Sequence, residues 1–122
     1  MIHKQSIFRW LAVALWCGII FYFSSIPSLR ITYGIWDMIL RKVIHAAEFG
    51  ILTFLVFKAL NTKNKPQTKI ALIWAFVFSF LYAISDEVHQ GFVAGRHANI
   101  LDVGIDSLGI VLVGWYLVKR NY

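Results

Sequence analysis

The sequence predicts an all-α integral membrane protein in which four transmembrane helices form an antiparallel bundle with both termini in the cytoplasm. The chain of 122 residues is 59% hydrophobic and only 15% charged. This composition is too apolar for a soluble domain, whose surface needs more polar side chains. The apolar residues fall into four long blocks. We therefore expect a single transmembrane domain over residues 1–122, with the lipid bilayer as its main partner.

The four expected helices each have about 18–23 residues, which at 1.5 Å per residue cross a hydrocarbon core of roughly 30 Å. The first apolar block has bulky aromatic residues and no small-residue cleavage site after it, which argues against a removed signal peptide. Pro27 ends the first helix, because proline cannot continue a hydrogen-bonded helical turn. The helices are expected at about residues 7–26, 41–60, 70–92 and 101–118.

Three connecting segments follow from this assignment. Residues 28–40 are expected to form a loop with enough apolar side chains to lie on the membrane surface, and residues 93–100 form a second loop on the same side. Residues 61–69 are rich in lysine, asparagine and threonine and contain one proline. This composition is typical of a short solvated turn between antiparallel helices.

The net charge of +6 indicates the topology of the chain rather than a surface for nucleic acid, and no nucleic-acid partner is expected. Four spans place both termini on one side of the membrane, together with eight of the twelve basic residues. The positive-inside rule assigns this side to the cytoplasm. The eight residues are Lys4, Arg9, Lys58, Lys63, Lys65, Lys69, Lys119 and Arg120.

Five of the six acidic residues lie inside the expected helices, toward their outer ends. A carboxylate costs about 2.5–3.5 kcal/mol at the middle of a bilayer, so acids in membrane helices are candidates for function. A purely structural role would add little stability, since interhelical hydrogen bonds contribute about 0.6 kcal/mol on average. The five residues are Glu48, Asp86, Glu87, Asp102 and Asp106.

Helical spacing places further polar residues beside these acids. Lys42, His45 and Glu48 are spaced by three and share one stripe of the second helix. Asp86 and Gln90 are spaced by four and share one stripe of the third helix. Both stripes lie at the outer ends of their helices, so they are expected to face each other.

The fourth helix carries a matching stripe of Asp102, Asp106 and Gly109. The glycine would let another helix approach this stripe closely. At 1.5 Å per residue, Glu48, Asp86 and Asp106 all lie roughly 7–9 Å below the expected outer boundary. Three helices therefore deliver acids to one level, which predicts one polar pocket that faces outward.

The charge of this pocket does not balance, because five acids face two basic residues and two histidines. Either some acids are protonated near neutral pH or a cation is bound. A divalent cation with carboxylate and histidine ligands fits this composition. We assign catalytic roles to His45, Asp86, Glu87 and Asp102, substrate binding to Lys42, Gln90 and Arg96, and metal binding to Asp86, Asp102 and Asp106.

Three polar segments stand out in the sequence, and Ser24-Ser25-Ile26-Pro27 follows the first helix. The three segments are Lys42-x-x-His45-x-x-x-Phe49, Ser85-Asp86-Glu87-x-His89-Gln90-x-Phe92-x-x-Gly95-Arg96 and Asp102-x-x-x-Asp106-x-x-Gly109-x-x-x-x-Gly114. Together they resemble the VanZ-like family of small bacterial membrane proteins. The resemblance covers about residues 10–117, and the family often has asparagine at the position of Asp106. It implies a multi-pass protein of the bacterial plasma membrane and a link to low-level resistance to the glycopeptide teicoplanin.

Two kinds of function fit these features. The first is a membrane enzyme or processing factor for a cell-envelope or lipid-linked molecule, in which Lys42 and Arg96 hold an anion and His45 or a carboxylate acts as general base. The alternative is a non-catalytic protein that sequesters an envelope ligand or an antibiotic. Coupling to ions or protons is less favoured, because no polar residue continues the path toward the inner side.

Overall fold

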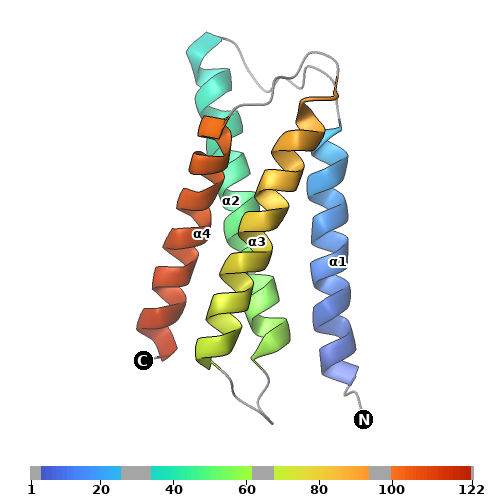
Figure 1. The fold of residues 1–122 in the computed structure, drawn as a ribbon, viewed down its shortest axis with the longest axis vertical. Coiled ribbons are helices and arrows are strands. Elements are labelled where there is room, and N and C mark those ends of the chain that lie inside the picture. Colours follow the sequence, from blue (N-terminus) through green and yellow to red (C-terminus); the bar gives the residue numbers. More distant parts are fainter. Residues whose placement is uncertain (1–3, 26–33, 62–67, 94–99, 122) are drawn as a thin grey trace.

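The structure is a computed structural model that describes residues 4–25, 34–61, 68–93 and 100–121. Its helices form an antiparallel bundle in which α1 begins and α4 ends at the same end of the molecule (Figure 1). The described residues contain no strand, and all four helices are long and apolar enough to cross a membrane. The predicted all-α bundle of four membrane-spanning helices is thus confirmed, whereas the cytoplasmic position of both termini stays a prediction. The helices are α1 (Lys4–Ser24), α2 (Gly34–Leu60), α3 (Thr68–Gln90) and α4 (Ile100–Asn121).

The start of α2 differs from the sequence-based expectation. The helix begins at Gly34, so the prediction of a loop up to residue 40 is wrong for residues 34–40. Asp37 lies in the first turn, where a negative charge is favourable at a helix N-terminus. It also pairs with Arg41 one turn later, at 3.0 Å. These two interactions, with helix-forming isoleucine, methionine and leucine between them, extend the helix. The other bounds agree within three residues.

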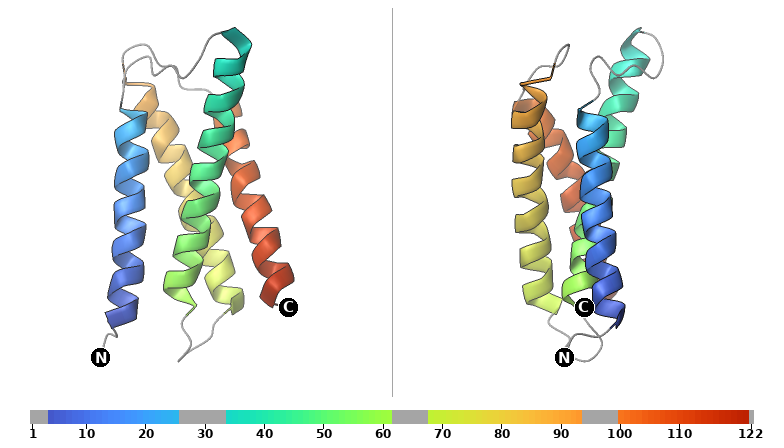
Figure 2. Two further views of the ribbon diagram at one scale, coloured as in Figure 1. Left: turned by 180° about the vertical axis from the view of Figure 1, so that it is seen from behind. Right: turned by 90° about the vertical axis from the view of Figure 1, so that its right-hand side faces the viewer.

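Helix α2 is the central element of the bundle. It packs against each of the other three helices, and α1 and α4 lie at opposite edges with α2 and α3 between them (Figure 2). Phe49, Leu52, Val56 and Phe57 of α2 are almost completely buried. Small residues of α3, Ala75 among them, pack in the same core. Residues of α2 can therefore reach side chains from every other helix.

The outside of the bundle is apolar. Large hydrophobic side chains on all four helices are exposed, at 69% for Phe8 and 64% for Leu112. Such a surface is unfavourable in water and suits the hydrocarbon core of a bilayer. Several polar residues, in contrast, are buried inside the bundle. Ionisable residues in membrane helices usually face the interior of the bundle rather than lipid.

A close crossing of α2 and α4 fixes their relative position. A Cβ atom added at Gly109 would overlap the backbone carbonyl of Ala46, and one added at Gly50 would lie 3.1 Å from the carbonyl oxygen of Gly109. The predicted close approach at Gly109 is therefore confirmed. Small residues at a helix contact let two backbones come together in a membrane, and this contact lies one residue from His45.

Side-chain hydrogen bonds attach α1 to the rest of the bundle. The Trp16 indole donates to the backbone carbonyl of Glu48 on α2, at 2.8 Å. The Tyr82 hydroxyl of α3 donates to the carbonyl of Cys17, at 2.7 Å. Because lipid gives little hydrophobic drive for helix association, such bonds and close packing hold membrane helices together.

Candidate functional site

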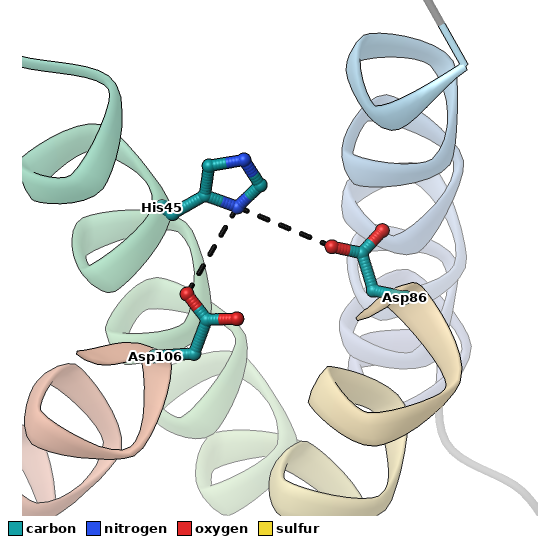
Figure 3. A group of neighbouring side chains, drawn as sticks. All are labelled: His45, Asp86 and Asp106. Atoms are coloured by element: carbon teal, nitrogen blue, oxygen red, sulfur yellow. Dashed lines mark ion pairs between the residues drawn. The ribbon is translucent and has the colours of Figure 1, made fainter. Parts of the chain in front are cut away.

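His45 stands where α2, α3 and α4 meet. Its Nδ1 atom lies 3.8 Å from Glu48 Oε2, 4.0 Å from Asp86 Oδ2 and 3.9 Å from Asp106 Oδ1. Figure 3 shows the imidazole ring between the two aspartates, which project toward it from α3 and α4. The imidazole is about a quarter exposed, whereas the two aspartate side chains are 3% and 2% exposed. The imidazole is thus the more exposed part of the site, and the two aspartate carboxylates are its buried part.

The backbone explains why these groups converge. Asp106 precedes Gly109 by three residues on α4, so it lies on the face that meets α2. His45 adjoins Ala46, the residue whose carbonyl contacts Gly109. The close crossing therefore brings His45 and Asp106 together. Asp86 arrives from α3, which packs against both helices.

The other nitrogen of His45 faces α3 and α1. Its Nε2 atom lies 3.4 Å from Gln90 Nε2, which also donates to Ser24 Oγ at 3.4 Å. The roles of the two ring nitrogens depend on the tautomer of His45. If the Gln90 amide nitrogen faces Nε2, Nε2 accepts and Nδ1 carries the proton; if the amide turns to present its oxygen, Nε2 can carry the proton and Nδ1 can accept or bind an ion. A doubly protonated imidazole would require the Gln90 amide to turn and present its oxygen. Gln90, predicted to bind substrate, here orients the histidine.

Lys42 and Asp102 form a separate pair toward the end of the bundle. The Lys42 ammonium donates to Asp102 Oδ1 at 2.6 Å, and the two side chains are 35% and 30% exposed. Asp102, predicted as both a catalytic residue and a metal ligand, thus pairs with a lysine rather than with His45. The pair is the more exposed part of the polar region.

The donor set that could hold a metal ion differs from the predicted one. One ligand atom from each of His45, Asp86 and Asp106 falls within 4.8 Å of the other two. The prediction of Asp86 and Asp106 as metal ligands is compatible with this geometry. Among the described residues, Asp102 does not belong to the set, and His45, to which only a catalytic role was assigned, does.

Two further residues, Glu87 and Arg96, were predicted to belong to the site. Glu87 is buried on α3, with 6% of its surface exposed. Arg96, predicted to bind an anion, lies outside the described residues.

Sequence reasoning missed the support that α1 gives to the site. Ser24, buried at the end of α1, accepts a hydrogen bond from Gln90. The next residue, Ser25, lies 2.9 Å from His89 through its hydroxyl, and the His89 ring stacks on Phe21. The two adjacent serines at the end of an apolar helix were the available signal, since small hydroxyl residues commonly join membrane helices.

Comparison with known proteins places this chain among described families. The model of the family described as VanZ/LLP1 matches residues 7–120. No curated protein and no solved structure matches the chain.

Proposed function

The chain belongs to the VanZ/LLP1 family, and we propose that it acts on a cell-envelope or lipid-linked molecule from a pocket on the outer side of the bacterial plasma membrane. In this topology both termini are cytoplasmic, as the distribution of basic residues favours. The observation that carries the proposal is the convergence of Glu48, Asp86 and Asp106 on His45 inside an otherwise apolar bundle. Ionisable groups at such a place are expensive, and in membrane proteins they mark sites of function.

The residues divide into two roles. Lys42 pairs with Asp102, and its side chain is about a third exposed. We propose that its ammonium also contacts an anionic group such as a phosphate that enters the site, and we assign Arg96 to the same role. His45 can take or give a proton through an imidazole that is oriented by Gln90. General acid–base catalysis needs such a positioned group within reach of the reacting atom. Asp86, Glu87 and Asp102 complete the proposed catalytic set.

A non-catalytic binder is the second candidate, and one observation favours it. The three carboxylate oxygens that face His45 Nδ1 lie at 3.8–4.0 Å, beyond the range of a hydrogen bond. At these distances the three carboxylates surround the ring as ion-pair partners, whereas a base in a catalytic dyad is held by one carboxylate through a short hydrogen bond. A protein that sequesters an envelope ligand or an antibiotic would need no such dyad.

The test compares site variants with a variant at the opposite end of the bundle. We expect Glu87→Gln, Asp102→Asn and Arg96→Ala to abolish a teicoplanin-susceptibility phenotype while the protein still inserts and accumulates. Lys119, which lies over the Trp115 ring at the other end, supplies the control Lys119→Gln, which should behave as wild type. Site variants that stay fully active, or lose activity only in proportion to lost protein, would contradict the proposal.

The same strains separate an enzyme from a binder. Lipid-linked cell-wall precursors are extracted from cells with and without the protein and compared by mass spectrometry. An enzyme changes the chemical composition of this pool, and the change disappears in Glu87→Gln. A binder leaves the composition unchanged and instead retains the antibiotic or precursor on the purified protein.

A further inference from the structure

We infer that His45, Asp86 and Asp106 bind one divalent transition-metal ion, of the Zn²⁺ class, between α2, α3 and α4. Glu48, whose Oε2 lies 3.8 Å from His45 Nδ1, lies beside this set but does not belong to it among the described residues. This inference rests on the proposed function, because it concerns the same site. It goes further by naming the cofactor and the atoms that hold it.

The spacing of the ligand atoms is the first observation. Two atoms bonded to one ion at about 2.1 Å lie roughly 3–4.2 Å apart, depending on the angle between the bonds. The distances from His45 Nδ1 to the three carboxylate oxygens are 3.8, 4.0 and 3.9 Å. They are too long for hydrogen bonds and fall within the range of ligands that share an ion.

Asp106 is the second, independent observation. Its side chain is 2% exposed, and its Oδ1 atom has no hydrogen-bond partner among the described residues. That oxygen points into the space beside His45 (Figure 3). Buried polar atoms are nearly always satisfied, so an orphaned carboxylate oxygen indicates a missing ion or water. Because this oxygen faces a second aspartate and a histidine, one ion at this place contacts all three groups.

The nearby basic residues are engaged elsewhere. Of the described residues at this end of the bundle, Arg41 pairs with Asp37 and Lys42 pairs with Asp102. The Arg41 guanidinium and the Lys42 ammonium therefore each pair with a carboxylate other than that of Asp106. A divalent ion would bring the positive charge that the buried carboxylate needs.

The mixed ligand set selects the class of ion. Imidazole is a good ligand for zinc and its neighbours, whereas Mg²⁺ and Ca²⁺ prefer oxygen ligands alone. Three ligands from one histidine and two carboxylates resemble catalytic zinc sites, which keep a position open for water or substrate. The imidazole side of the site is the exposed one, so an open position would face the pocket. When bound, such an ion polarises a phosphoryl or carbonyl oxygen.

The test measures ion content in detergent-purified protein that has been loaded with ZnCl₂ and dialysed. We expect one Zn²⁺ per chain in the wild type and at least a tenfold loss in Asp106→Asn and His45→Gln. Asp102→Asn is the matched control, since it removes a carboxylate of the same helix that pairs with Lys42, and it should keep one ion. Circular dichroism and gel filtration show whether each variant is folded.

Thermal unfolding of the wild type gives a second measurement that needs no variant. An ion that binds only the folded state raises the melting temperature, so Zn²⁺ should raise it and a chelator should lower it, with no effect of MgCl₂ at the same concentration. A wild type that holds no Zn²⁺, a melting temperature that responds to Mg²⁺ instead, or loss of the ion in Asp102→Asn but not in Asp106→Asn would each overturn the inference. Failure of the proposed function is distinguishable, because Asp102→Asn is expected to lose the phenotype while it keeps the ion.

Discussion

The contact between α2 and α4 provides the sharpest test of the architecture, through the substitution Gly109→Ala. The added Cβ atom would overlap the carbonyl oxygen and carbon of Ala46 and lie 3.1 Å from its Cα. All three atoms belong to the backbone, so no side chain can rotate away and the two helices must separate. Overpacking of this kind costs about 1–3 kcal/mol, and the rigidity of the neighbour places the expected loss near the upper value.

Gly114→Ala is the matched control on the same helix, because nothing lies within 4 Å of a Cβ atom there. Alanine favours a helix over glycine by about 1 kcal/mol, so this variant should be as stable as the wild type or more stable. The same gain applies to Gly109→Ala, so the free energies of unfolding of the two variants should differ by the overpacking cost alone, about 1–3 kcal/mol. Denaturant titration in detergent, followed by circular dichroism, measures the difference. Equal stabilities would refute the close crossing, and with it the reason that Asp106 reaches His45.

Three further predictions concern topology and the polar contacts. A cysteine placed at Ala98 should react with a membrane-impermeant thiol reagent in intact cells while one at Lys65 does not; the reverse pattern would show that the site faces the cytoplasm. Lys42→Gln should change the free energy of unfolding by less than about 1 kcal/mol, because partly exposed ion pairs contribute little, yet it should weaken binding of an anionic ligand in an equilibrium binding assay; a larger loss of stability would mark the pair as structural. Trp16→Phe should lower stability by about 0.6–1.7 kcal/mol through loss of its hydrogen bond to α2, and an unchanged melting temperature would count against that contact.

Much of the fold followed from the sequence because a bilayer leaves few alternatives. Twenty apolar residues in lipid must be helical, so length and composition fix the number and direction of the spans. The start of α2 was not predicted correctly, because an apolar segment at the membrane surface has the same composition whether it forms a loop or a helix. The interaction of Asp37 with Arg41, at a spacing of four, joins a residue that was assigned to the loop to the first residue of the expected helix.

The sequence predicted which residues lie in the polar region but not which of them contact each other. Shared depth and helical stripes brought acids of three helices to one level, and Gly109 indicated which faces touch. The rotation of each helix decides the partners, however, and a difference of one residue turns a side chain by about 100°. Asp102 and Asp106 lie on one stripe, yet the first pairs with Lys42 and the second faces His45. Depth separates the two outcomes, because Asp102 lies about one turn above Asp106 just as Lys42 lies about one turn above His45.

The central claim is that the buried acids serve function rather than hold the bundle together, and the free energy of unfolding of Asp106→Asn tests it most directly. The comparison with wild type is made in the presence of a chelator, so that no ion contributes. Asn keeps the shape of the side chain and removes the cost of burying a charge. The account predicts that the variant is as stable as the wild type or more stable. A loss of more than about 2 kcal/mol, as expected when a partner in a buried structural contact is removed, would contradict it.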